Sequence, residues 1–96
     1  MNLGKVAGTV VSTQKDDKLV GAKLLVVRQL DLEGDPTGAF VIAVDAVGAG
    51  PGEVVLYASG SSARQTALTK DKPADAVIMA IVDSIEVEGR ILYQKP

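Results

Sequence analysis

The chain has 96 residues and a mass of 9.9 kDa, a length that predicts one domain spanning residues 1–96. Its residues are 47% hydrophobic but only 3% aromatic, so aliphatic side chains must supply the core, and disorder is excluded. Because cysteine and histidine are absent, disulfides, thiol nucleophiles, imidazole bases and ordinary zinc sites are excluded too. The formal net charge of -2 argues against nucleic acid and anionic membranes as partners.

Short β-strands separated by turn residues dominate the pattern along the chain. The expected strands are Leu3 to Thr13, Lys23 to Leu30, Phe40 to Asp45, Glu53 to Tyr57, Val77 to Val82 and Ile91 to Tyr93. Turns are expected at Lys15 to Lys18, Glu33 to Gly38 and Glu88-Gly89, the last closing a hairpin. Ser62 and Gln65 have capping-box spacing and predict one helix of about two turns. The fold class is therefore all-β, a small antiparallel barrel of OB type with one short α-helix.

Three of these strands are apolar on both faces, which a barrel with a single interior does not require. They are Leu24 to Val27, Phe40 to Val44 and Val77 to Val82. We expect their outward side chains to be covered by another copy of the same chain. The alternative is that these small aliphatic side chains are simply exposed.

The glycine-rich loop Gly48 to Gly52, followed by Glu53, is the most distinctive local feature. A phosphate-binding loop would need a lysine and a hydroxyl residue at the start of a helix, whereas here a strand follows. The pattern favours a tight structural loop that packs close to a neighbouring backbone.

A second segment, Gly60 to Arg64, has two interpretations. Amides at a helix start, the hydroxyls of Ser61 and Ser62, and the Arg64 guanidinium could together bind an anion. Alternatively Ser62 caps the helix and Arg64 pairs with a carboxylate across a subunit interface, which is the interpretation we favour. A serine nucleophile would need Lys70 or Lys72 as its base, and nothing in the sequence places either there.

Other site chemistries find little support. Asp45, Glu53 and Asp83 each flank an apolar strand and could form an acid–base pair or bind a hard metal ion, but no spacing signature links them. An OB-type barrel also suggests oligonucleotide binding, which uses aromatic residues in a basic groove. This chain offers Phe40, which lies in a core-like run, and two tyrosines. No catalytic residue, cofactor or metal site is predicted.

The order of several segments resembles the EutN/CcmL family of bacterial microcompartment vertex proteins. The resemblance rests on Lys5 to Thr13, Lys23 to Val27, Asp45 to Glu53, Gly60 to Arg64, Asp75 to Val77 and Ile81 to Asp83. It covers nearly the whole chain. The Gly-Ala-Gly loop and the Gly-Ser-Ser-Ala-Arg segment are specific in combination, although either alone would be weak.

The resemblance implies a barrel assembled as a cyclic homopentamer at the vertices of a polyhedral shell. Its partners would be further copies of itself and hexameric shell proteins, in the shell of a cytoplasmic microcompartment, and its role would be structural. The expected subunit-interface or pore-rim residues are Gly48, Ala49, Gly50, Gly52, Glu53, Ser61, Ser62 and Arg64. The alternative is an OB-like module that binds a small molecule, an anion or an oligonucleotide.

Overall fold

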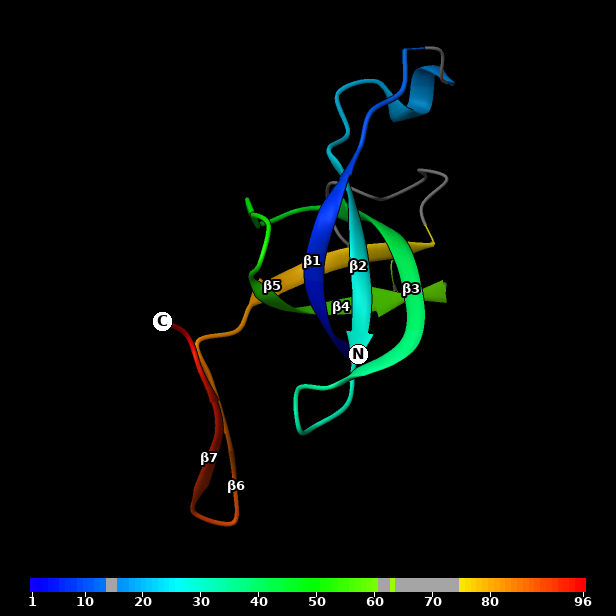
Figure 1. Cartoon of the computed structure of the whole chain (residues 1–96). Helices are drawn as coiled ribbons and strands as arrows, with labels where there is room; N and C mark the ends of the chain where they lie inside the picture. Colours follow the sequence, from blue (N-terminus) through cyan, green and yellow to red (C-terminus); the bar gives the residue numbers. More distant parts are fainter. Residues whose placement is uncertain (14–15, 61–62, 64–74) are drawn as a thin grey trace.

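A closed five-stranded barrel forms the body of the protein (Figure 1). The computed structural model describes residues 1–13, 16–60, 63 and 75–96. The barrel strands are β1 (Asn2–Val10), β2 (Leu24–Leu30), β3 (Pro36–Asp45), β4 (Val54–Ser59) and β5 (Ala76–Ile81), in the order β1-β2-β3-β5-β4. The expected small barrel is confirmed. One pair, β3 with β5, is parallel, because an odd number of strands cannot alternate in direction all the way around a closed barrel.

The barrel interior is filled by small aliphatic side chains and one tyrosine. Leu25, Val27, Val55 and Ile78 are completely buried there, and Tyr57 is 2% exposed. Burial raises the pKa of the Tyr57 hydroxyl. With so few aromatic residues in the sequence, methyl and methylene contacts provide most of the packing energy.

Gly4 on β1 is required by close packing in this interior. A Cβ atom at this position would lie 2.3 Å from Val27 Cγ1, 2.9 Å from Tyr57 Cε1 and 3.1 Å from the carbonyl oxygen of Arg28. A side chain at this position would therefore collide with the packed interior. Gly8 differs, since nothing lies within 4 Å of its added Cβ, and the β1–β2 register shifts between Val6 and Gly8. Gly8 therefore accompanies a β-bulge.

Some strands are apolar on both faces because a second, smaller apolar cluster lies outside the main core. Val44, Ala58, Val77 and Ala63 are buried together outside the main core, with Leu24 packed against them. The chain therefore covers the outward side of β5 at Val77 by itself. On β3 the outward side chains of Phe40 and Ile42 stay uncovered, at 61% and 42% exposure. Phe40 was expected in a core-like run, and that expectation is wrong because its side chain lies on the outer face.

The turn between β2 and β3 is tighter than the sequence suggested. The backbone N–H of Asp31 donates to Asp35 O at 2.8 Å, and Asp31 Oδ1 accepts from the backbone N–H of Asp35 at 3.0 Å. These two bonds close the turn early, so β3 begins at Pro36 rather than at Phe40. Proline is compatible with the first residue of a strand because its position there need not donate to the ladder.

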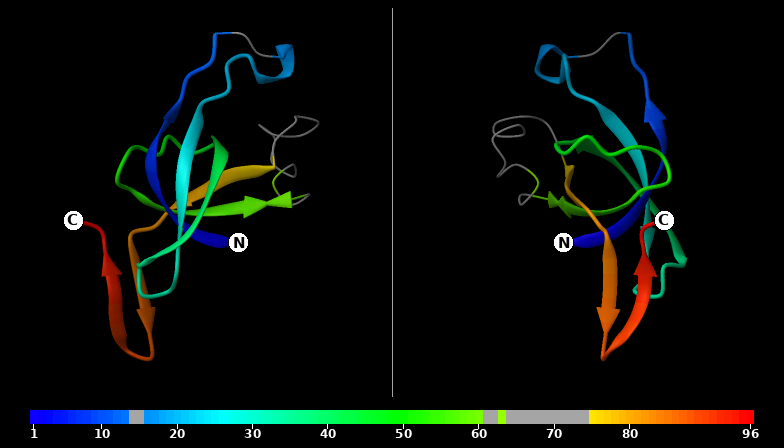
Figure 2. Two further views of the ribbon diagram at one scale, coloured as in Figure 1. Left: turned by 45° about the vertical axis from the view of Figure 1, so that its right-hand side comes forward. Right: turned by 90° about the vertical axis from the view of Figure 1, so that its left-hand side faces the viewer.

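The C-terminal strands β6 (Ser84–Val87) and β7 (Arg90–Gln94) form a separate two-stranded sheet. This hairpin projects from the barrel, on the side opposite the 3-10 turn η1 (Asp17–Leu19), as the views of Figure 2 agree. The expected hairpin turn lies at Glu88 and Gly89, both with positive φ. The predicted helix after Ser62 lies outside the described residues. Among the described residues, no helix is long and apolar enough to cross a membrane.

Candidate functional site

The loop between β3 and β4, residues 46–53, is organised by a carboxylate at the end of β3. Oδ1 of Asp45 accepts hydrogen bonds from the backbone N–H groups of Val47 (3.1 Å), Gly48 (3.1 Å) and Ala49 (3.2 Å). The Asp45 side chain is only 2% exposed, so water competes poorly for these bonds. Ala49 itself is completely buried in the barrel core. Asp45 therefore holds the first half of the loop against the barrel.

Lys23 contacts the same loop from the solvent side. Its Nζ donates a hydrogen bond to Ala49 O at 3.1 Å and lies 3.7 Å from Asp45 Oδ2. The Lys23 side chain is half exposed, and ion pairs of exposed lysines add little stability. Lys23 therefore orients the loop chiefly through its hydrogen bond to the carbonyl.

Glu53 holds the second half of the loop and joins it to the C-terminal segment. Its Oε1 accepts from the backbone N–H of Gly50 at 2.7 Å, and its Oε2 accepts from Lys95 Nζ at 2.8 Å. The hydrogen bond from Lys95, followed by that from Gly50, lowers the pKa of the Glu53 carboxyl. The same contact raises the pKa of Lys95. One carboxylate thus connects the loop to the base of the β6–β7 hairpin.

Glycine is required at two of the loop positions by backbone conformation. Gly48 and Gly52 have φ values of 76° and 85°, in the left-handed region that disfavours other residues. Gly50 has no such φ, and an added Cβ would meet only Glu53 Oε1, at an ordinary contact distance of 3.5 Å. Within one subunit Gly50 is therefore replaceable. A requirement for glycine at this position would have to come from a neighbouring molecule.

The backbone amides of this loop are unavailable to an external phosphate. Those of Val47, Gly48 and Ala49 donate to Asp45, and that of Gly50 donates to Glu53. The amides of Gly52 and Glu53 donate to carbonyl oxygens, and Pro51 has no amide hydrogen, so from Val47 to Glu53 every amide is engaged. Two negative carboxylates occupy the place where an anion would bind. The structure agrees with the interpretation of this segment as a structural loop. The expected close packing against a neighbouring backbone is not found within the subunit, because no backbone atom lies within 4 Å of an added Cβ at Gly48, Gly50 or Gly52.

The three carboxylates considered for chemistry do not act together. Asp45 and Glu53 bind backbone amides and lysines, as described above, while Asp83 offers its carbonyl oxygen to the backbone N–H of Lys95 at 2.8 Å. In the part of the chain that the structure describes, no group of three or more acidic side chains could hold a metal ion. The carboxylates of Asp45 and Glu53 therefore have local structural roles, whereas Asp83 contributes through its backbone carbonyl.

Nothing in the sequence identified Lys23 and Lys95 as partners of this loop. Lys95 is 42 residues from Glu53 in sequence, and no local pattern connects them. Of the other expected site residues, Ser61, Ser62 and Arg64 lie outside the described residues, as do Lys70 and Lys72. Ala63 between them is completely buried.

An exposed apolar surface on β3 is the second candidate contact region. Phe40 and Ile42 face outward, and Phe40 lies opposite Arg28 of β2. We call these three residues, Arg28, Phe40 and Ile42, the outer patch. Tyr57, in contrast, is inside the barrel and cannot stack on a base. A rigid barrel with a braced loop and an uncovered apolar face is a structural unit suited to contacts with other protein chains.

Comparison with known proteins shows to which family this chain belongs. The family model described as "Ethanolamine utilisation protein EutN/carboxysome" matches residues 1–83. The carboxysome shell vertex protein CcmL of Nostoc sp. is 48% identical over 96 residues, covering 99% of this chain and 95% of the relative. The microcompartment shell vertex protein EutN of Escherichia coli is 40% identical, covering 99% of this chain and 100% of the relative. The chain belongs to the EutN/CcmL family, and the resemblance seen in the sequence is confirmed.

Solved structures of relatives have the same fold. The structure of Nostoc CcmL aligns with a TM-score of 0.95 over 99% of this chain and 100% of that chain, at 48% identity. The pentameric microcompartment shell protein GrpN of Rhodospirillum rubrum aligns with a TM-score of 0.82 over 91% of this chain and 100% of that chain, at 49% identity. The relatives are thus named as shell vertex proteins of carboxysomes and other microcompartments, the class of function that the resemblance implied.

Proposed function

We propose that this chain assembles as a closed ring of five copies and occupies the vertices of a polyhedral bacterial microcompartment shell. The observation behind the proposal is full-length similarity to shell vertex proteins, including a pentameric relative at 49% identity. The exposed outer patch gives a physical reason for association. Phe40 and Ile42 are exposed to water in the monomer, and burying them against another copy lowers the free energy of the associated state.

A vertex role follows from geometry. Flat hexameric tiles form sheets that do not close, and five-fold units introduce the curvature that closes a polyhedron around its enzymes. The partners are therefore further copies of this chain and hexameric shell proteins. A cyclic ring requires two different patches on each subunit, one for each neighbour.

A structural role, without catalysis, is part of the proposal. Asp45 and Glu53 hold loop backbone, and the sequence contains no histidine or cysteine. A vertex protein must hold fixed angles to the adjoining shell proteins, so we expect its subunit to be rigid.

We further propose that the loop containing Gly48, Ala49, Gly50, Gly52 and Glu53 lies at a subunit contact or at the rim of the central opening. Because Gly50 can be replaced within the monomer, a larger residue at this position tests whether a neighbouring subunit packs against the loop. Ser61, Ser62 and Arg64 are proposed for the same region on sequence grounds alone.

Native mass spectrometry of the purified chain at micromolar concentration tests the ring. A dominant species of five copies is expected. A monodisperse monomer or a stable dimer contradicts the ring, whereas a hexamer contradicts only the vertex role.

The vertex role itself is tested in cells that make the complete microcompartment with this protein removed. Shells should become elongated or open, an intermediate should escape, and the enclosed enzymes should keep their activity in a lysate. Closed, regular shells by electron microscopy, in the absence of this protein and any paralogue, would refute the vertex role. Loss of a catalytic step in the lysate would point to an enzyme instead.

A further inference from the structure

The β6–β7 hairpin is an element whose own contacts do not account for its stability. It forms a sheet of its own and projects from the barrel (Figures 1 and 2). An isolated two-stranded hairpin is at best marginally stable in water. Its attachment lies at the base, where Lys95 bonds to Asp83 through the backbone and to Glu53 through the side chain. The remainder of the hairpin needs a further contact.

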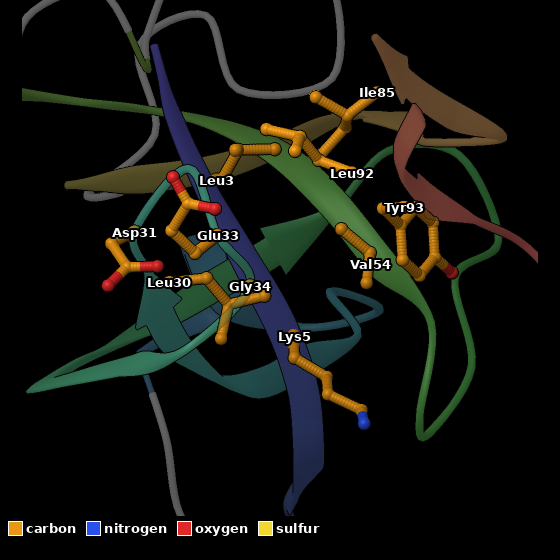
Figure 3. Close-up of a pocket in the computed structure, with 10 residues that line it drawn as sticks. All are labelled: Leu3, Lys5, Leu30, Asp31, Glu33, Gly34, Val54, Ile85, Leu92 and Tyr93. Atoms are coloured by element: carbon orange, nitrogen blue, oxygen red, sulfur yellow. The ribbon is translucent and has the colours of Figure 1, made fainter. Parts of the chain in front are cut away.

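One side of the hairpin is apolar and faces an open groove. Ile85 pairs with Tyr93 across the two strands, and Leu92 is the extra residue at the bulge beside them. These three side chains line the groove together with Leu3, Leu30 and Val54 of the barrel (Figure 3). Its volume is about 200 Å³. That is less than the roughly 300 to 1,000 Å³ of typical small-molecule sites, and it suits one or two protruding side chains.

Acidic residues stand at one rim of this groove. Asp31 and Glu33, from the turn between β2 and β3, lie side by side there (Figure 3). Lys5 of β1 also lines the groove, with its ammonium group pointing away from these two acids (Figure 3), so the acids outnumber the cations by two to one. Neither has an ion-pair partner among the described residues, although Asp31 Oδ1 accepts the amide of Asp35. A partner that inserts an apolar side chain with a cation beside it would fit both the groove and its rim.

The outer patch of the same chain has this chemistry. Phe40 is 61% exposed and lies directly opposite Arg28, which in turn lies opposite Lys5 on β1. Two cations directly opposite each other on adjacent strands repel. Arg28 has no ion-pair partner in the described part of the chain. A carboxylate from outside would relieve this repulsion while Phe40 and Ile42 are buried.

We infer that the groove between the β6–β7 hairpin and the barrel receives the outer patch of the neighbouring copy in the ring. Phe40 and Ile42 of one subunit occupy the apolar groove of the next, and Arg28 reaches its Asp31 and Glu33. This inference rests on the proposed pentamer. It gives each subunit one donor patch and one acceptor patch, the head-to-tail arrangement that closes into a ring.

The hairpin lies beyond the residues that the family model matches, although full-length relatives align over 99% of the chain. The family model ends at Asp83, one residue before β6 begins. We therefore expect the hairpin to strengthen a contact to which the barrel also contributes, so that its disruption weakens the ring more than it unfolds the subunit.

Disulfide crosslinking tests the contact directly, because the chain contains no cysteine of its own. A double variant with Ile42→Cys and Leu92→Cys should give, after mild oxidation, covalent species of up to five chains on a denaturing gel. Each single variant should remain monomeric on the gel. The matched control replaces Ile42→Cys by Val20→Cys, because Val20 is 65% exposed and directly follows the 3-10 turn η1, outside the outer patch.

Charge reversal provides a second measurement that leaves the apolar residues intact. Arg28→Glu should raise the concentration at which the ring dissociates by about tenfold or more. Combining it with Glu33→Arg should restore much of the loss, whereas Glu33→Arg combined with Lys18→Glu should not. Circular dichroism of each variant verifies that the subunit is folded.

The outcomes separate this inference from the proposed function. A wild-type pentamer with neither the covalent series nor charge rescue overturns the groove contact and leaves the pentamer standing. Covalent dimers alone indicate a two-fold contact and also overturn it. A wild-type chain that is not a pentamer refutes the proposed function, and the inference with it.

Discussion

Replacing Asp45 by alanine tests whether one carboxylate holds the β3–β4 loop in place. The substitution removes the acceptor of three backbone N–H groups. Val47 and Gly48 are exposed, so water can satisfy their amides after a small movement. Ala49 is completely buried, and an unsatisfied buried donor costs about 1–3 kcal/mol. With part of the other two bonds lost as well, we expect Asp45→Ala to lower the free energy of unfolding by about 3 kcal/mol.

Asp45→Asn is the informative companion variant. Its amide oxygen can still accept from the loop, while its charge near Lys23 is lost. The Lys23 side chain is 55% exposed, so the ion pair contributes less than about 1 kcal/mol. We expect this variant to lose about 1 kcal/mol, well below the loss for alanine.

Urea unfolding followed by circular dichroism measures both variants. At a typical slope of about 2 kcal/mol per M, Asp45→Ala should move the midpoint by about 1.5 M. Protein concentration must be held fixed, since ring formation stabilises the folded subunit by mass action. Asp83→Ala, another aspartate at the end of an apolar strand, is the matched control and should change little. A loss under about 1 kcal/mol for Asp45→Ala, or equal losses for alanine and asparagine, would refute the role of the three bonds.

Three further outcomes are expected. Gly4→Ala should destabilise the subunit by about 1–3 kcal/mol in the same urea assay because the barrel is overpacked, whereas Gly8→Ala should not; equal effects would contradict the packing argument. Because the pKa of Glu53 is lowered in the folded state, its pair with Lys95 stabilises above the unfolded-state pKa and is lost as the pH falls through the folded value. The stability difference between wild type and Lys95→Gln should therefore vanish in acid, and a constant difference across pH would argue against the pair. Gly50→Val should leave the isolated subunit folded but weaken the ring by native mass spectrometry, and unchanged rings would place the loop away from any neighbour.

The two surfaces of the proposed interface differ in the charges that surround them. The groove carries two acidic side chains, Asp31 and Glu33, against one lysine, Lys5, whereas the outer patch carries the cation Arg28. The net difference in charge should steer unassembled copies toward the unlike patch. Steering of this kind depends on ionic strength. Ring formation should therefore slow as salt is added, with a smaller effect on rings already formed.

The sequence by itself determined the fold class and the family. Short runs rich in valine and isoleucine, separated by glycine and proline turns, predicted the strands, because these signals act within a few residues. The Gly48 to Gly52 loop was correctly predicted to be structural, since a strand and not a helix follows it. A glycine inside a strand, such as Gly4, often marks a close approach, but the sequence does not identify its neighbours Val27 and Tyr57.

The tertiary structure decided which faces are covered and which side chains meet. Strand alternation alone cannot distinguish Val77, buried beneath Ala63, from Phe40, exposed on the outer face, because both belong to runs that are apolar on both sides. The pairing of Glu53 with Lys95 and the groove beside the C-terminal hairpin are equally invisible in the sequence. Such contacts join residues that are distant along the chain, and their free energies depend on distances that only barrel closure sets.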